Sequence, residues 1–266
     1  MRVAAVLTAA LGLCIGVPSA AHAKDDLVER YRPVVRYDSR ENGFAQALDD
    51  RRRPIGADRV YGHRIRDGGR TWLQYWLFFA YNSQDRGLLR TGRHEGDWEF
   101  AQLRLGRNAR PDLLVVAQHS WAERCGRFEV RGEAPVLYVA NASHAVYPRR
   151  GTTDRPWPDP NDEADGLGRQ VRPPVTVVSA GAPPWMAYRG RWGASRAGPW
   201  PGEESSPRGP RFQEDRRFSR PAAYAAKAEV CGSTPPGAPW PAPAAALGVM
   251  LAIVAGGWAW RRRRPT

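Results

Sequence analysis

The segment from His94 to Glu99, with the sequence HEGDWE, gathers one histidine and three acidic residues around a tryptophan. In a β-strand, alternate side chains share a face, so Glu95, Asp97 and Glu99 are expected on one face and Trp98 on the other. Carboxylates roughly 7 Å apart along a strand repel one another unless a divalent cation neutralises them. The alternative is that they pair with arginines, which are plentiful in this chain.

A fourth acidic residue strengthens the cation interpretation. Asp85 follows a strand-like run in YNSQDRG, so a loop could fold it back over the cluster. We therefore predict a metal site formed by Asp85, His94, Asp97 and Glu99, in which His94 supplies a nitrogen ligand or only a hydrogen bond. An oxygen-rich set without cysteine favours Ca²⁺ or Mg²⁺, with Mn²⁺ as the alternative, over Zn²⁺.

Further residues are candidates for the same pocket: Glu95, His119, His144 and Asp165. His144 ends a strand-like run, where a hydrogen-bonded structural role is the commoner one. Asn161, Glu163 and Asp165 alternate as at the start of a calcium loop, but Arg172 stands where the closing acid would be. The chain contains neither G-x-S-x-G nor H-E-x-x-H, so the catalytic residues of an enzyme are not indicated.

The N-terminal residues 1–23 are typical of a secretory signal peptide. Arg2 precedes an apolar run, and the run closes on the small-residue cleavage pattern Ala21-His22-Ala23. The alternative is an uncleaved membrane anchor. Either way, the segment predicts export, so residues 24–230 are expected to form an extracytoplasmic domain.

The C-terminal region predicts a membrane anchor. Residues 242–260 carry no charged side chain, and Arg261–Arg264 follow directly. That length is close to the roughly 20 residues that cross a bilayer, and the arginines are expected to stay in the cytoplasm within a tail at 261–266. A Pro-rich linker is expected at 231–241. A buried core helix or a sorting tail removed after export are the alternatives.

The net charge bears on partners. The formal charge is +13, of which Arg2 and the four terminal arginines contribute five, leaving +8 on the exported part. This charge suits an anionic lipid head group, a glycan or a wall polymer, although an arginine-rich composition is also typical of a GC-rich bacterial genome. The basic residues do not alternate with a stacking face, so no nucleic-acid partner is indicated.

Two cysteines remain after export, Cys125 and Cys231. An oxidising compartment allows them to form a disulfide, which would tie the end of the domain to its body. Two unpaired thiols are the alternative.

The sequence indicates a mostly β protein, and we predict a two-sheet β-sandwich with long loops. A Gly-rich turn at 66–70 predicts a hairpin, and 182–210 is expected to form a long ordered loop. Short helices are expected at 25–31 and 221–229. Strands are predicted at 59–65, 71–82, 98–105, 112–121, 127–132, 134–145 and 173–180.

HEGDWE, together with the later YVANASHAVYP and DEADGLG, resembles the vacuolar protein sorting-associated protein 62-like family over residues 30–215. That resemblance implies little biochemistry. HEGDWE also resembles, more distantly, the heptapeptide GHRHDWE of the necrosis- and ethylene-inducing-like proteins. In that family the motif lies on a β-sandwich, where an Asp, a His, an Asp and a Glu hold a divalent cation.

The second resemblance implies the same ligands as the residue pattern. Asp97 and Glu99 match the acids of DWE, His94 matches the first histidine, and Asp85 matches the upstream aspartate with a spacing that differs by about one residue. Gly96 replaces the second histidine and an acid replaces the arginine, so a different pocket chemistry is expected. Membrane lysis is not implied, because the surface loops it needs have no match.

Three functions are compatible with these features. The first is a membrane-anchored, extracytoplasmic protein that binds a divalent cation and, through it, a polar or anionic ligand. The second is a metal-dependent cell-surface hydrolase with His94 or His119 as general base. The third is a structural surface module whose acids pair with arginines and that binds no metal.

Overall fold

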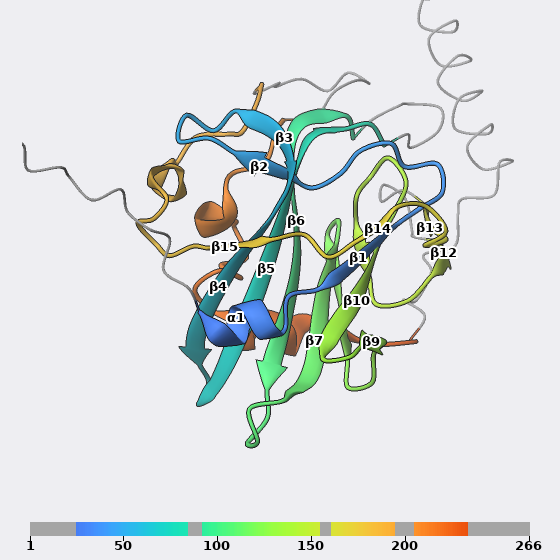
Figure 1. The fold of residues 1–266 in the computed structure, drawn as a ribbon, viewed down its shortest axis with the longest axis vertical. Helices are drawn as coiled ribbons and strands as arrows, with labels where there is room; N and C mark the ends of the chain where they lie inside the picture. Colours follow the sequence, from blue (N-terminus) through green and yellow to red (C-terminus); the bar gives the residue numbers. More distant parts are fainter. Residues whose placement is uncertain (1–24, 85–91, 155–160, 195–204, 234–266) are drawn as a thin grey trace, which may run out of the picture.

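The structure is a computed structural model that describes residues 25–84, 92–154, 161–194 and 205–233. It is mostly β, with 45% of the described residues in strands and 10% in helices. Two sheets face each other, and short helices and long loops cover the outside (Figure 1). The predicted β-sandwich is confirmed.

The large sheet is a meander extended at both edges. Its five central strands are antiparallel, and each outer strand pairs in parallel with its neighbour. In spatial order the strands are β15 (Val175–Val177), β4 (Val60–Asp67), β5 (Arg70–Asn82), β6 (His94–Leu105), β7 (Pro111–Gln118), β8 (Trp121–Cys125) and β16 (Glu229–Val230).

The small sheet brings distant parts of the chain together. Its β1 and β10 run parallel, with Val34 opposite Val136. In spatial order its strands are β11 (Val146–Tyr147), β10 (Ala134–Val139), β1 (Val34–Tyr37) and β14 (Gln170–Val171), while β9 (Val130–Arg131) pairs with β10.

Hairpins and short helices complete the described chain. One hairpin joins β2 (Gln46–Leu48) to β3 (Pro54–Asp58), and another joins β12 (Gly151–Thr153) to β13 (Asp162–Ala164). The helices are α1 (Asp26–Arg30), α2 (Pro221–Lys227) and the 3₁₀ turns η1 (Pro184–Ala187) and η2 (Pro210–Phe212).

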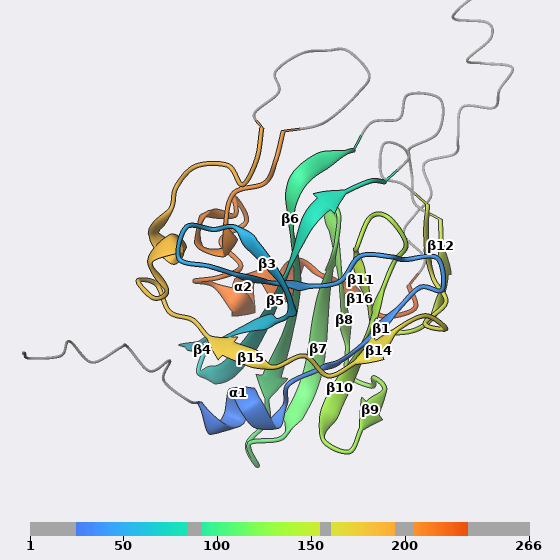
Figure 2. The same cartoon turned by 45° about the horizontal axis from the view of Figure 1, so that its top comes forward.

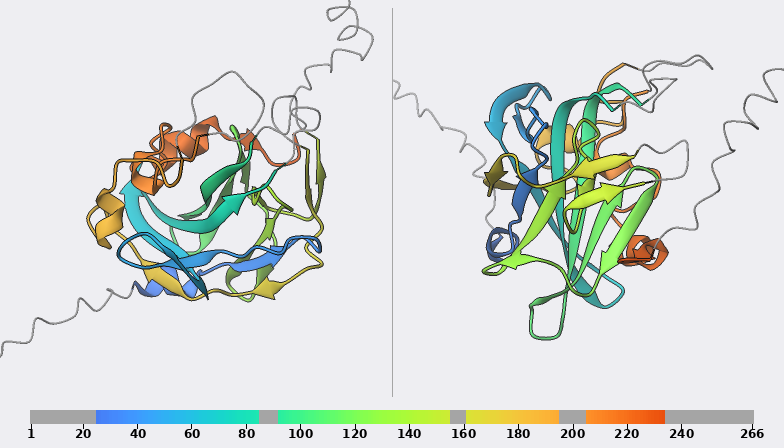
Figure 3. Two further views of the ribbon diagram at one scale, coloured as in Figure 1. Left: turned by 90° about the horizontal axis from the view of Figure 1, so that it is seen from above. Right: turned by 90° about the vertical axis from the view of Figure 1, so that its right-hand side faces the viewer.

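Two hydrophobic layers flank the large sheet. The side chains of β5 and β6 that face the small sheet form the sandwich core, and they include Leu77 and Leu103. The opposite side chains, among them Trp76 and Trp98, form an aromatic layer covered by η1, α2 and the segment 205–218. Seen from above, the small sheet and the orange C-terminal segment accordingly lie on opposite sides of the large sheet (Figure 3, left).

Most of the predicted elements are found, with shifted ends. Gly68 and Gly69 form the predicted β4–β5 turn with φ of 57° and 72°, the left-handed conformation that a two-residue hairpin turn requires. Both predicted helices are present. In contrast, 127–132 contributes only the two-residue β9, and 134–145 ends as a strand at Val139.

The termini lie outside the described residues. The signal peptide at 1–23 and the apolar segment at 242–260 therefore stay predictions, as does the linker beyond residue 233. Within the four described ranges, no helix is long and apolar enough to cross a membrane.

The predicted disulfide is confirmed. Cys125 and Cys231 are bonded, with their Cα atoms 4.9 Å apart. Cys125 ends β8 and Cys231 follows β16, which lies beside β8 (Figure 2). A covalent closure of 106 residues removes much of the conformational freedom of the unfolded chain, roughly 4–5 kcal/mol in a chain-entropy description.

Candidate functional site

A polar cavity lies where β6 and β7 separate. β6 pairs with β5 along its whole length, but its pairing with β7 extends only as far as Ala101. The earlier part of β6 therefore has no strand neighbour on that side, and a cavity of about 290 Å³ opens there. Its polar lining includes Asn82, His94, Asp97, Glu99, His119 and Arg217.

From Asp97 onward, the side chains of β6 alternate between the two faces of the sheet, as predicted. Asp97 and Glu99 are buried on the cavity side, whereas Trp98 and Phe100 belong to the aromatic layer. Trp98 packs against the rings of other residues in that layer, with Trp192 at 5.0 Å and Phe78 at 5.0 Å between centroids. This packing fixes the strand and holds both carboxylates at the cavity.

Glu95 does not share this face, so that part of the prediction is wrong. Gly96 has φ of 61°, which turns the strand before Asp97 and interrupts its alternation. A Cβ at Gly96 would lie 2.2 Å from the carbonyl oxygen of Trp192, so glycine is required here. The Glu95 carboxylate instead accepts a hydrogen bond from the backbone N–H of Ala194 at 3.3 Å.

Asp97 is held by neutral and basic donors. Its Oδ2 accepts hydrogen bonds from Asn82 Nδ2 at 3.1 Å and His144 Nδ1 at 2.9 Å. Its Oδ1 lies 3.9 Å from His94 Nε2. Burial raises the pKa of Asp97, but the hydrogen bond from His144 and the charges of the two histidines outweigh burial and lower it. Asp97 is therefore ionised at neutral pH.

His144 links Asp97 to a second carboxylate. It stacks on Phe79 with centroids 3.9 Å apart, and its Nε2 lies 3.7 Å from Glu41 Oε2. Burial lowers the pKa of His144, but the bonds to Asp97 and Glu41 overcome burial and raise it to about 9. Glu41 also accepts from the backbone N–H of Gly43 and Ala142. An imidazolium thus lies between two carboxylates.

Glu99 has a different environment. It is 8% exposed, and burial followed by the charge of Asp97 raises its pKa well above the usual value, against the opposing effect of Arg217. Within the described residues, no group donates a hydrogen bond to its carboxylate. Glu99 therefore faces the cavity as an acid that needs a proton or a cation.

His119, which also lines the cavity, is paired with a second carboxylate behind it. His119 lies in the two-residue β7–β8 turn with φ of 55°, and its Nε2 is 2.6 Å from Asp162 Oδ2. Asp162 also accepts from Ser143 Oγ at 2.6 Å and Tyr147 OH at 2.5 Å. Burial raises the pKa of Asp162, but these donors, His119 first, lower it overall.

Arg217 brings a positive charge to the cavity. Its guanidinium lies 4.6 Å from the ring centroid of Tyr224 and 5.5 Å from that of Phe100. One of its nitrogens is 2.5 Å from Asp215. The cavity therefore combines two acids with a buried arginine.

The predicted residues are partly brought together. His94, Asp97, Glu99 and His119 line one cavity, whereas Asp85 lies outside the described residues. His144 lies behind Asp97. In the described ranges, no three side chains of His, Cys, Asp or Glu are grouped closely enough to hold a metal ion, so the metal site stays a prediction.

The calcium-loop interpretation of 161–166 is not supported by the side-chain contacts. Asp165 accepts from the backbone N–H and Oγ of Ser39, and Glu163 pairs with Arg40. Asp162 is buried instead, and no pattern in the sequence marked it as a site residue. Asn82 and Arg217 were also missed; only the position of Asn82 at the end of a strand leading into the motif signals its role.

No protein-family model and no curated protein matches the sequence. The resemblance to the vacuolar protein sorting-associated protein 62-like family is therefore unsupported.

Solved structures of necrosis- and ethylene-inducing proteins are similar to this chain. One is Necrosis and Ethylene inducing Protein 2 from the causal agent of cocoa's Witches Broom disease, at 15% identity and TM-score 0.40, covering 59% of this chain and 74% of that chain. Another is NLPPya in complex with mannosamine, at 15% identity and TM-score 0.42, covering 60% and 75%. A third is the non-toxic HaNLP3 protein, at 13% identity and TM-score 0.40, covering 57% and 73%. Similarity at this level transfers no residue role.

Proposed function

We propose that the protein is an exported, membrane-anchored β-sandwich protein that binds a divalent cation in the β6–β7 cavity and, through it, a polar or anionic ligand. The observation that carries the proposal is Glu99. Its buried carboxylate lies beside ionised Asp97, and no described group donates a hydrogen bond to it. A cation would neutralise both acids without a proton.

The donor chemistry fits Ca²⁺ or Mg²⁺. Asp97 Oδ1 and the Glu99 carboxylate are hard oxygen donors, and His94 Nε2 lies 3.9 Å from Asp97. One nitrogen in such a set is also compatible with Mn²⁺. Closure around an ion would require these side chains to draw together, and Asp85 is the proposed fourth ligand. Asn82 and His144 would orient Asp97 by occupying its other oxygen.

The ligand class follows from the remaining lining. A bound cation would add positive charge to a cavity that already contains Arg217. Both groups favour an oxyanion, such as a phosphate or a carboxylate on a glycan. Because Nε and Nη2 of Arg217 are bonded to Asp215, Nη1 is the terminal nitrogen that remains to donate to such a group.

Calorimetric titration and thermal unfolding with Ca²⁺, Mg²⁺ and Mn²⁺ test the proposal. Glu99→Gln keeps the volume and removes the charge, so it should abolish cation binding while the unfolding temperature in chelator stays nearly unchanged. Glu163→Gln is the matched control, because Glu163 lies on the surface and pairs with Arg40. A wild-type protein that shows no cation-dependent shift would leave the structural module without metal as the function.

His119 and Asp162 support a second candidate, a metal-dependent hydrolase. Asp162 accepts the Nε2 proton of His119 and so leaves Nδ1 as the nitrogen able to take a proton from a water molecule. A screen of phosphate-ester and glycoside substrates, with and without chelator, tests this candidate. Hydrolysis that requires metal and is lost in His119→Gln would support it, and binding without turnover would exclude it for those substrates.

A further inference from the structure

A cluster of arginines surrounds the exposed end of the disulfide. We call it the arginine face and define it as Arg124, Arg127, Arg149 and Arg150. Two adjoining open hollows of about 430 and 610 Å³ contain these residues, and both hollows are lined by Arg127, Arg149 and Cys231. The face therefore surrounds the point where the C-terminal strand is bonded to the body.

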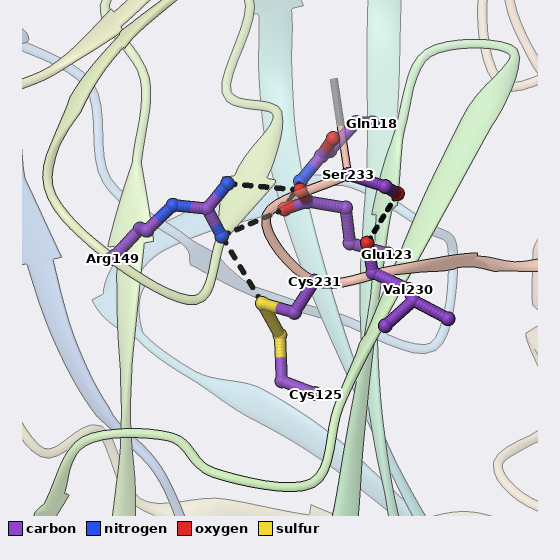
Figure 4. Close-up of a disulfide and its surroundings, with 7 residues drawn as sticks. All are labelled: Gln118, Glu123, Cys125, Arg149, Val230, Cys231 and Ser233. Atoms are coloured by element: carbon purple, nitrogen blue, oxygen red, sulfur yellow. Dashed lines mark hydrogen bonds and ion pairs between the residues drawn. A yellow bond between two sulfur atoms is a disulfide. The ribbon is translucent and has the colours of Figure 1, made fainter. Parts of the chain in front are cut away.

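Arg149 is held in place by the disulfide region. Its Nη2 lies 3.0 Å from Glu123 Oε1, and its Nη1 lies 3.3 Å from Glu123 Oε2 and 3.1 Å from Cys231 Sγ (Figure 4). Glu123 is 5% exposed and also accepts from Gln118. The guanidinium is thus fixed by a buried acid while half of the side chain stays in solvent.

The other three arginines carry uncompensated charge. Within the described ranges, no acidic side chain forms an ion pair with Arg124, Arg127 or Arg150. The exposed acid of these hollows, Glu129, is engaged with Tyr138 at 2.5 Å and faces Arg36 at 3.6 Å. Val230 adds a 58% exposed apolar side chain beside Arg124, its partner in the β8–β16 register. The face is positive with an apolar element.

The disulfide places this face near the predicted anchor. β16 and Cys231 are fixed to β8, and the described chain ends at Ser233. Residues 234–241 separate that point from the apolar segment at 242–260. So short a connection spans at most about 30 Å when fully extended. Ser233, two residues beyond the disulfide-bonded Cys231, therefore lies within about that distance of the start of the predicted anchor.

We propose that the arginine face rests on the anionic phospholipid head groups of the membrane that holds residues 242–260 and so fixes the orientation of the sandwich. This inference rests on the anchorage in the proposed function. Positive charge, an exposed apolar side chain and a short tether all favour a lipid surface over a soluble partner. The cavity is at the other end of β8, beside the His119 turn, and would be held away from the bilayer.

Each arginine close to an anionic membrane favours the bound state by roughly a factor of five. The three unpaired arginines together therefore bias the orientation on the order of a hundredfold. Because the effect is electrostatic, it should weaken at high ionic strength.

The test uses the full chain reconstituted in vesicles of phosphatidylcholine alone or of phosphatidylcholine mixed with phosphatidylglycerol. Amide hydrogen exchange is measured for peptides spanning 124–131 and 147–151. We expect exchange about tenfold slower in the anionic vesicles, and no such difference in the triple variant Arg124→Gln, Arg127→Gln, Arg150→Gln. The matched control removes the same charge from exposed arginines elsewhere: Arg51→Gln, Arg66→Gln, Arg107→Gln.

The outcomes separate the two proposals. Equal exchange in both lipids, or equal loss of protection in both triple variants, overturns docking by this face. Extraction with alkaline carbonate tests anchorage separately. A chain retained in the bilayer without protection refutes the docking alone, whereas a chain that is extracted refutes the anchorage and the docking with it.

Discussion

Two buried aspartates support the walls of the cavity, and their surroundings differ. Asp162 accepts hydrogen bonds from three side chains, His119, Ser143 and Tyr147. Asp97 uses one oxygen for Asn82 and His144, and its other oxygen lies 3.9 Å from His94 Nε2. A carboxylate whose acceptors are filled holds elements together, whereas one with a free oxygen beside a second acid is available to an ion.

The largest effect is expected at Asp162, the aspartate whose carboxylate accepts three hydrogen bonds. Asp162→Ala leaves three buried donors without an acceptor, so we expect a loss of about 3–5 kcal/mol in the free energy of unfolding, measured by urea denaturation. Glu163→Ala removes the adjacent but exposed acid and should cost at most about 1 kcal/mol. Equal losses in the two variants would contradict the assigned role of Asp162.

The next effect concerns pH and His144. Its pKa rises from about 6.5 in the unfolded chain to about 9 in the fold. Its stabilisation is therefore complete below pH 6.5 and is lost as the pH rises through 9. We expect a loss on the order of 3 kcal/mol across this interval in chelator, measured as the free energy of unfolding.

His144→Gln should remove most of that alkaline loss. His63→Gln is the matched control, because burial lowers the pKa of His63 and its contribution falls at acid pH instead. An alkaline loss that persists in His144→Gln would show that another group carries it. The lowered pKa values of Asp97 and Glu41 predict a separate loss as the pH falls through their folded values.

The pair of Asp97 and Glu99 is tested by measuring how much a cation stabilises the fold. At a hundredfold excess over its dissociation constant, a cation that binds only the folded form stabilises it by about 2.7 kcal/mol. We expect Glu99→Gln to lose this gain and to unfold in chelator much like the wild type, because Glu99 already resists ionisation. Asp97→Asn is less specific, since it also removes the partner of His144. A gain that survives in Glu99→Gln would place the cation elsewhere.

The smallest effect is expected at Glu95. Glu95 is exposed, and among the described residues its carboxylate accepts a hydrogen bond only from the backbone N–H of Ala194. Glu95→Gln should change the free energy of unfolding by less than about 0.5 kcal/mol and leave any cation effect intact. A large change in cation binding would return Glu95 to the ligand set.

The sequence predicted the parts of the fold that depend on local patterns. The alternation in DWEF correctly predicted that Asp97 and Glu99 face away from Trp98, because successive side chains of a regular strand point to opposite faces. The pattern failed at Glu95, since Gly96 adopts a left-handed conformation and the distant Trp192 lies too close to it for a side chain. A local sequence pattern does not show which distant residues tertiary packing will bring into contact.

The same limit explains the missed aspartate. Asn161, Glu163 and Asp165 looked like ligands because they alternate, but β13 buries Asp162 and Ala164 and exposes Glu163 between them. Whether the odd or the even positions of this strand are buried depends on which of its faces packs against the rest of the domain. Arg217 reaches the cavity from beyond η2, through packing on Phe100 and Tyr224, which no local pattern encodes.

The parallel pairing of β1 with β10 has a consequence for the order of folding. It brings Val34 beside Val136, and closing so long a loop is slow compared with forming the β4–β8 meander. Glu41 follows β1 and His144 follows β10, so the contact between Glu41 and His144 cannot form before this pairing. His144, which donates a hydrogen bond to Asp97, is thus expected to reach it late in folding, after the two sheets have closed.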